Sequence, residues 1–275
     1  MALLPYASPL QRVWHYAFRL FCALVFLFLV APVLAIVPLS FNQEPYFTYP
    51  MPGWSLRWYL EFFTSVQWQL AFKNSVIVGV SSTLLAAILG TTAALGLSQA
   101  RFPLKGLVIA TLISPMVVPI VITAVGMYFF YARLGLTTTL PGIILAHAAL
   151  GLPFVVITVT AALAGFDRTL VRAGQSLGAG PTRVFFTVTL PLILPGVISG
   201  ALFAFATSWD EVIVVLFLAG TPQHTLPRRM WSGIRELLSP TILAVATILV
   251  VLSVLLMIAT EMLRRRSERL RGIRT

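Results

Sequence analysis

The chain has 275 residues, of which 59% are hydrophobic and only 10% charged, and its formal net charge is +11. Soluble domains carry about 25% charged residues, so this composition excludes an ordinary water-soluble fold and predicts an integral membrane protein. A large positive charge also suits nucleic-acid binding. Here, however, the basic residues gather at the ends of apolar runs and in the C-terminal tail, as they do in membrane proteins. We therefore expect contact with membrane lipid and none with nucleic acid.

Six apolar runs are long enough to cross a bilayer, which takes about 20 residues in a helix. They cover residues 20–39, 75–97, 107–131, 143–165, 192–219 and 242–260. The first run also resembles a signal peptide, with a possible cleavage site at residues 33–35. It is longer than a typical signal core, so we favour a retained span. The sequence thus predicts an all-α membrane protein with six transmembrane helices, forming a single domain over residues 1–275 with its core at about 70–265.

The distribution of basic residues predicts the orientation. Most of the 19 lysines and arginines fall in the loops and termini on one side, including the basic tail 263–275. Cytoplasmic loops carry an excess of Lys and Arg, so this side is cytoplasmic and both termini face inward. The tail is expected to contact anionic lipid.

Two segments on the predicted outer side are candidates for short surface helices. SLRWYLEFF at 55–63 precedes the second run, and TLPRRMWSGIRELLSP at 225–240 precedes the sixth. Both mix aromatic, apolar and charged residues, which suits an amphipathic helix lying in the interface. Either segment could receive a partner, but anchoring by an aromatic belt explains them equally well.

The predicted inner loop at 166–191 has a pattern of its own. Asp167 is a candidate N-cap for a helix starting at Arg168. Gly178 stands where the C-terminus of that helix favours a left-handed residue, and Pro181 suits the first position of a second short helix. The residues expected to share one apolar face are Leu170, Ala173, Gly174 and Leu177. A helix, a glycine turn and a second helix could either dock a cytosolic partner or rest on lipid headgroups.

An acidic pair, Asp210 and Glu211, falls inside the fifth apolar run beside Ser208 and Trp209. A carboxylate in a membrane helix costs about 2.5–3.5 kcal/mol on insertion scales. Neighbouring helix positions point about 100° apart, so both carboxylates cannot face one spot. Carboxylates and an aromatic ring attract a cationic solute. Alternatively, the pair is structural and is satisfied by internal donors or by an arginine of another subunit.

The sequence offers no catalytic or metal-binding constellation. Its single cysteine, Cys22, and its three histidines, His15, His147 and His224, lack the spacing of metal ligands. Neither lysine lies in a GxxxxGK[ST] phosphate loop. We therefore expect no enzyme activity and no bound cofactor, and any ATP hydrolysis would come from another subunit.

The run RAGQSLGAGPTRVFFTVTLPLILPG at 172–196 resembles the cytoplasmic signature loop of permease subunits of bacterial ATP-binding-cassette importers. That signature reads Glu-Ala-Ala, three residues, Gly, about nine residues, and a hydrophobic-x-Leu-Pro ending. Ala173, Gly178 and Leu190-Pro191 match it. Arg172 stands where the family usually has Glu, and Gly174 where it usually has Ala.

The resemblance implies a type I importer permease fold, with a cytoplasmic coupling helix between transmembrane helices 4 and 5. In such importers the coupling loop, here 166–191, docks in a groove of an ATPase subunit. The residues that this docking would use are Arg172, Ala173, Gly174, Leu177, Gly178, Ala179 and Pro181. An arginine at 172 would favour an acidic groove.

The partners implied by the same resemblance are two ATP-binding subunits, which bind ATP and Mg, a second permease that is usually a different chain, and an extracytoplasmic solute-binding protein. The location implied is the bacterial cytoplasmic (inner) membrane.

The segment at 208–250 is similar to the spermidine/putrescine-type permeases, which implies a polyamine as the solute and a pathway near Ser208, Trp209, Asp210 and Glu211. Related members carry aminoethylphosphonate or opines. The alternative is a self-contained secondary transporter that uses Asp210 or Glu211 as a proton or cation site. That alternative predicts an inverted internal repeat, and the two halves show no convincing one.

Overall fold

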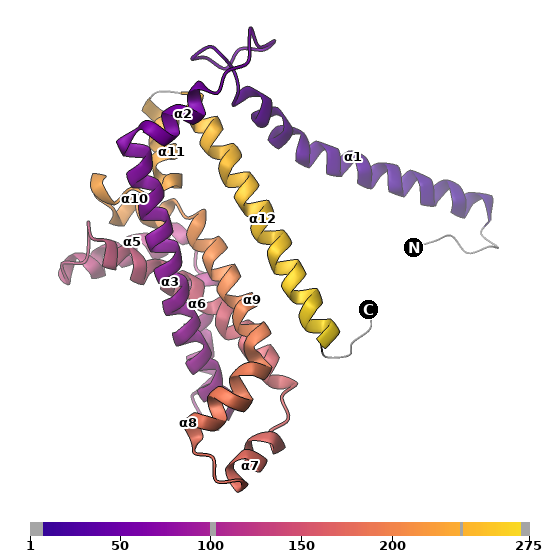
Figure 1. The fold of residues 1–275 in the computed structure, drawn as a ribbon, viewed down its shortest axis with the longest axis vertical. Coiled ribbons are helices and arrows are strands. Elements are labelled where there is room, and N and C mark those ends of the chain that lie inside the picture. The colour runs from indigo at the N-terminus through magenta and orange to yellow at the C-terminus, as the bar shows by residue number, and fades with distance from the viewer. Residues whose placement is uncertain (1–7, 100–102, 237–238, 271–275) are drawn as a thin grey trace. The chain divides into compact units, whose positions relative to one another are not determined.

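The computed structural model describes residues 8–99, 103–236 and 239–270 (Figure 1). Within these ranges every regular element is helical, which confirms the predicted all-α class. The α-helices are α1 (Pro9–Leu39), α2 (Arg57–Thr64), α3 (Val66–Gln99), α4 (Lys105–Val117), α5 (Ile120–Arg133), α6 (Leu140–Ala164), α7 (Thr169–Ser176), α8 (Pro181–Val184), α9 (Leu190–Trp209), α10 (Ile213–Leu218), α11 (Leu226–Glu236) and α12 (Thr241–Leu270). A π-helical turn, Phe185–Thr189, joins α8 to α9, and a 3₁₀ turn, Thr221–Gln223, follows α10.

The chain divides into two compact units. The first comprises residues 1–63 and 237–250, and the second comprises residues 64–236 and 251–275. The first therefore contains α1, α2 and the beginning of α12, whereas the second contains α3 to α11 and the remainder of α12. The single domain expected over residues 1–275 stays a prediction.

Four helices of the described residues are long and apolar enough to cross a membrane, namely α1, α3, α6 and the continuous helix Pro181–Trp209. The predicted third span is not one straight helix, because α4 and α5 meet at an angle of 108°. Pro119 explains the break, since a proline forces the residue before it out of the helical region, and Val118 has φ −71° and ψ 134°. The apolar section Thr241–Leu255 of α12 is shorter than these spans, so the count of six stays a prediction.

Helices α3, α6 and α9 form the core of the second unit, and each of them contacts the other two. Glycines let their backbones approach closely. A Cβ atom added at Gly151 of α6 would lie 2.8 Å from the Cβ of Ala204, and one added at Gly200 of α9 would lie 2.7 Å from the Cα of Val155. Small residues at helix contacts are the usual means of tight packing inside membranes, where no hydrophobic force holds helices together. The three helices are therefore held together by close packing of complementary surfaces.

Two loops of the second unit lie at opposite ends of this core (Figure 1). At one end, the Nδ2 of Asn74 on α3 donates to the carbonyl oxygens of Pro222 and His224, at 2.9 and 3.0 Å. At the other end, the guanidinium of Arg168 donates to the carbonyl oxygen of Ser98, at 2.6 Å. The loop at 221–225 and the loop at 166–191 are thus fixed to opposite ends of α3.

Both predicted surface segments form helices, which confirms that part of the expectation. In the first unit, α2 buries Trp58 and Phe62 and exposes Leu60 and Phe63. The indole N–H of Trp58 donates to the carbonyl oxygen of Asn42 at 2.6 Å, which ties α2 to the preceding loop. In the second unit, α11 packs on α3.

Candidate functional site

In the loop at 166–191, Asp167 caps α7 from outside the helix. Helix α7 starts at Thr169, one residue later than expected. The Asp167 carboxylate accepts a hydrogen bond from the Thr169 hydroxyl at 2.7 Å and another from the Thr169 backbone N–H at 2.8 Å. These two bonds hold the pKa of Asp167 below its ordinary value. The side chain therefore satisfies a free N–H of the first turn, as expected, although not from the N-cap position itself.

Gly178 ends α7 in the left-handed conformation that the sequence predicts, with φ +83°. Its N–H donates to the carbonyl oxygen of Gln175 at 2.9 Å, and the N–H of Ala179 donates to that of Gly174 at 3.1 Å. This pair of bonds is a Schellman motif, which satisfies the last carbonyls of a helix. No heavy atom lies within 4 Å of a Cβ added at Gly178. The backbone angle alone, and not crowding, therefore demands glycine here.

The second short helix begins at Pro181 as predicted, but it is not separate from the helix that follows. Pro181 does start a helix, with Gly180 as its N-cap, but that helix continues through the π-helical turn into α9 as one element, Pro181–Trp209. The N–H of Leu190 donates to the carbonyl oxygen of Phe185, five residues back. The next residue, Pro191, has no N–H to donate. The wider π turn carries the helix past this gap, so Pro191 does not mark a new start.

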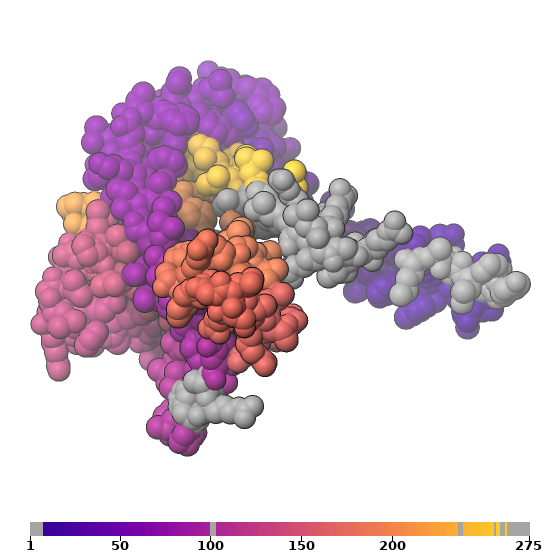
Figure 2. Space-filling view, turned by 60° about the horizontal axis from the view of Figure 1, so that its bottom comes forward, coloured from indigo at the N-terminus to yellow at the C-terminus, as the bar shows by residue number. Residues whose placement is uncertain are grey.

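The apolar residues of α7 do not form one buried face. Gly174 packs toward α8, where a Cβ added to it would lie 3.2 Å from the Cγ2 of the buried Val184. In contrast, Leu170 is 44% exposed and Leu177 is 88% exposed. Figure 2 brings this end of the molecule forward, and the surface of α7 and α8 lies uncovered there. The loop therefore forms a platform that presents apolar groups outward.

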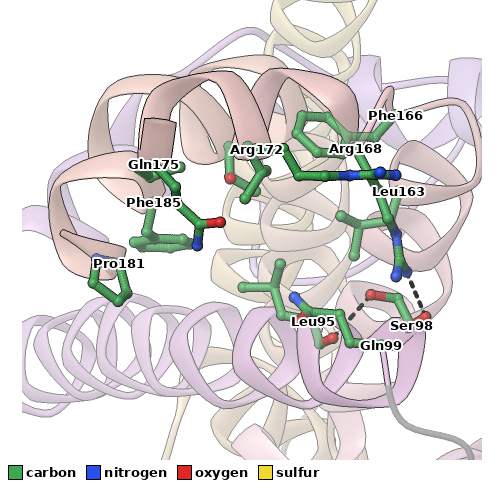
Figure 3. A pocket seen from close by; sticks show the side chains of 13 residues that line it. Leu95, Ser98, Gln99, Leu163, Phe166, Arg168, Arg172, Gln175, Pro181 and Phe185 are labelled. Atoms are coloured by element: carbon green, nitrogen blue, oxygen red, sulfur yellow. Dashed lines mark hydrogen bonds between the residues drawn. The ribbon is translucent and has the colours of Figure 1, made fainter. Parts of the chain in front are cut away.

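A pocket of about 450 Å³ lies between this platform and the ends of α3 and α6 (Figure 3). Arg168 and Arg172 line it, together with Gln175. Arg168 is held by the Ser98 carbonyl oxygen, and the one acidic residue of the loop, Asp167, is engaged by Thr169. The exposed Arg172 also attracts the Asp167 carboxylate. The arginines of the loop outnumber this one acid, so the platform is basic on balance.

At the other end of the core, the acidic pair does not lie inside a helix, which corrects the prediction. Helix α9 ends at Trp209, and Asp210 follows with φ −101° and ψ 2°. A carboxylate oxygen of Glu211 accepts from the N–H of Val214 at 2.8 Å, which caps the first turn of α10. An acidic side chain that bonds to nearby backbone competes with helix continuation. The apolar run therefore divides into two helices at this pair.

The four residues expected to share a pathway have different surroundings. Ser208 and Trp209 are buried, at 7% and 6% exposure. The Trp209 ring stacks on that of Phe205, with centroids 5.3 Å apart. Glu211 is half-buried and engaged as a cap, whereas Asp210 is exposed. Of the four, Asp210 is the exposed side chain, and Glu211 makes a structural contact with the first turn of α10.

His147 of α6 is a buried polar residue whose role the sequence did not predict. Its Nδ1 lies 2.7 Å from the hydroxyl oxygen of Ser208, and the hydroxyl of Ser82 on α3 lies 3.2 Å from that same oxygen. The sequence did not predict these contacts of His147. An ionisable residue within an apolar span is a functional candidate by default, and that signal was present in the sequence.

Comparison with known proteins identifies the family. Residues 82–269 match the family described as the binding-protein-dependent transport system inner membrane component. The chain is 32% identical over 248 residues to the spermidine/putrescine transport system permease protein PotC of Haemophilus influenzae, covering 90% of this chain and 96% of that one. It is 35% identical over 231 residues to the putrescine transport system permease protein PotI of Escherichia coli, covering 82% of each chain.

A solved structure agrees at the level of the fold. A bacterial ABC transporter involved in the import of the acidic polysaccharide alginate aligns with a TM-score of 0.73, covering 95% of this chain and 99% of that chain at 16% identity. An identity this low shows the fold alone. Because the family match and both relatives span most of the sequence, the protein belongs to the inner-membrane permease subunits of binding-protein-dependent, ATP-binding-cassette importers, and it is a transport subunit and not an enzyme.

Proposed function

We propose that this chain forms one half of the translocation pathway of an ATP-driven polyamine importer, with spermidine and putrescine as its solutes. The observation that carries the proposal is the match to two polyamine permeases, at 32% and 35% identity over 90% and 82% of the chain. A relative with another named solute, the molybdenum transport system permease protein ModB of Mycobacterium bovis, matches over a smaller share, 65% of the chain.

The assembly that we propose has a second permease, a different chain, beside this one. Two ATP-binding subunits, which hold ATP and Mg, bind on the cytoplasmic side. An extracytoplasmic solute-binding protein delivers the solute to the opposite side. Both termini of this chain are cytoplasmic in this arrangement, which follows from the excess of basic residues on that side.

The platform formed by α7 and α8 is the proposed contact with an ATP-binding subunit. Its support is the combination of the outward-facing Leu170 and Leu177, the exposed Arg172, and the Schellman turn at Gly178. Apolar groups rimmed by a guanidinium suit a protein groove with an apolar floor and acidic walls. Lipid headgroups are the competing occupant, and they would not require a rigid turn.

The same helices connect the platform to the solute end. Helix α6 leads into α7, and the helix that begins at Pro181 continues without a break to Trp209. Glycines at the contact between α6 and α9 let the two helices pack closely. When the ATP-binding subunits close, we expect the platform to move as a unit with α6 and α9 and so to shift Asp210.

Asp210 is the proposed contact for the cationic solute on this chain. A polyamine is a chain of ammonium groups, and an exposed carboxylate attracts it by Coulomb interaction. The side chain is exposed at the end of α9. Glu211, by contrast, is proposed to hold the turn into α10.

Reconstitution in proteoliposomes tests the proposal. The complete assembly, with ATP inside and solute-loaded binding protein outside, should accumulate labelled spermidine. Uptake should stop when ATP or the binding protein is omitted, and excess putrescine should compete, whereas molybdate should not. ATP-dependent uptake that ignores polyamines would overturn the solute, and uptake by this chain alone along an ion gradient would favour the secondary transporter.

A further inference from the structure

Three helices of the core meet in one buried polar cluster, which comprises His147 of α6, Ser208 of α9 and Ser82 of α3. His147 is 1% exposed and its Nδ1 lies 2.7 Å from the Ser208 oxygen. The Ser82 hydroxyl lies 3.2 Å from the same oxygen and 3.3 Å from the carbonyl oxygen of Gly79. The core around the cluster is apolar, so these three polar side chains hydrogen-bond in surroundings of low polarity.

The contact with Ser208 is the one hydrogen bond of the His147 ring among the described residues. The other ring nitrogen of His147, Nε2, has no hydrogen-bond partner among the described residues. A buried polar group is stabilised by its hydrogen bonds and is unfavourable without them. The Nδ1 contact with Ser208 is therefore the hydrogen bond that holds the imidazole in its place, and together with the Ser82 hydroxyl it holds the serine.

The cluster lies at the point where α9 ends. Ser208 directly precedes Trp209, and the N–H of Asp210 closes the last turn on the carbonyl oxygen of Ala206 at 3.3 Å. On the α3 side, a Cβ added at Gly79 would lie 3.1 Å from the Phe205 ring and 3.6 Å from the Trp209 ring. The last turn of α9 is thus held by a hydrogen bond with α6, and by a longer hydrogen bond and close packing from α3.

We infer that His147 is a positioning residue for the solute pathway. By holding the Ser208 hydroxyl, it fixes the direction in which the Asp210 carboxylate points from the end of α9. The inference rests on the proposed function, in which Asp210 meets the cationic solute. His147 does not contact the solute itself. Its loss lets the final turn of α9 rotate, so the carboxylate faces the solute less often while the coupling platform stays intact.

Two amide side chains separate this role from simple packing. The amide of an asparagine can lie where the imidazole Nδ1 lies, whereas that of a glutamine reaches the position of Nε2. His147→Asn therefore preserves a partner for Ser208, and His147→Gln does not. Ser208→Ala removes the contact from the other side by deleting a single oxygen, and it tests the inference even where a change at His147 prevents assembly.

The experiment uses the complete importer in proteoliposomes and measures spermidine accumulated per ATP hydrolysed, normalised to assembled complex. His147→Gln, His147→Leu and Ser208→Ala should lower this ratio at least fivefold, and His147→Asn should retain at least half of it. The matched control is Thr91→Val, which removes another buried hydroxyl of α3 outside the cluster and should leave the ratio unchanged. Equal ratios for Asn and Gln, or a wild-type ratio for Ser208→Ala, would overturn the inference.

A double variant tells a failure of this inference from a failure of the proposed function. If His147 acts through the carboxylate, His147→Leu combined with Asp210→Asn should be no worse than Asp210→Asn alone. An additive loss would show that His147 acts elsewhere and would sink the inference. If Asp210→Asn transports normally, the proposed role of Asp210 fails, and the positioning role that depends on it fails with it.

Discussion

The two ends of the α6–α9 core stop their helices by different means. At the platform end, α7 stops because one residue, Gly178, adopts φ +83° and its neighbours close two hydrogen bonds within six residues of chain. At the opposite end, α9 stops at the acidic pair, and its last turn contacts His147 on α6 and Ser82 and Gly79 on α3. The α7–α8 platform therefore depends on one backbone conformation, whereas the last turn of α9 also depends on contacts between distant segments.

The largest effect is expected from a change in the turn at Gly178. Gly178→Val places a β-branched residue in the left-handed region, which costs about 1–3 kcal/mol. The turn should rearrange, and ATP-dependent uptake by the reconstituted importer should fall by about tenfold or more. Uptake normalised to assembled complex is the measurement.

Two controls isolate the backbone angle as the cause. Asparagine tolerates the left-handed region, so Gly178→Asn should keep most uptake. Gly180 is exposed and has φ −66° with open space around a Cβ, so Gly180→Ala should also transport. Normal uptake in Gly178→Val would contradict the claim that this turn organises the coupling surface.

At the end of α9, substitutions of the two carboxylates should have different effects on uptake. Asp210→Asn removes an exposed charge, and losing roughly 1 kcal/mol of attraction corresponds to about a fivefold fall in polyamine uptake. Glu211→Gln keeps an oxygen that can accept from the N–H of Val214, so uptake should remain within about twofold. Glu211→Ala should lower the free energy of unfolding by about 1 kcal/mol. Equal losses of uptake in Asp210→Asn and Glu211→Gln would refute the division of roles between the two carboxylates.

A smaller effect is expected at Arg172, where the platform carries its exposed guanidinium. Exposed ion pairs contribute about 0.2–1 kcal/mol, so Arg172→Glu should weaken binding of the ATP-binding subunit by about two- to fivefold. The difference should shrink at high salt because exposed charges are screened. Arg133→Glu, an exposed change at the last turn of α5, is the control, and tighter binding by Arg172→Glu would argue against an acidic groove.

The smallest effect is expected at Gly174. Alanine in a helix interior is favoured over glycine by about 1 kcal/mol, but the new Cβ would lie 3.2 Å from the Cγ2 of Val184. The two effects oppose each other, so Gly174→Ala should change the melting temperature by only a few degrees and leave uptake unchanged. Gly174→Leu cannot fit and should separate α7 from α8, which a loss of stability in thermal unfolding would reveal.

The inner loop was predictable because its signals are local. The left-handed glycine, the proline at the start of α8 and the acidic cap before α7 each act within a few residues of their own position. The continuity of α8 with α9 was not predicted, because Pro191 looks like a helix start in sequence. In the structure a π turn places it inside one helix.

The contacts around the last turn of α9 were not predictable from local pattern. Hydropathy runs on through the end of α9 and through the bend between α4 and α5, although Pro119 was a signal for the bend. The contacts that define the α9 end join Ser208 to residues 61 and 126 positions earlier in the chain. Side chains that far apart are brought together by the packing of α3, α6 and α9, which no local spacing encodes.

The most direct test of the account is to identify what covers the α7–α8 platform in the membrane. A photo-crosslinking residue at Leu177, which is 88% exposed, should form an adduct with an ATP-binding subunit in the assembled importer. The same residue at Phe203, an exposed position on α9, should not. An adduct with lipid alone at Leu177, in complexes that still hydrolyse ATP and import polyamine, would contradict the docking role of the platform.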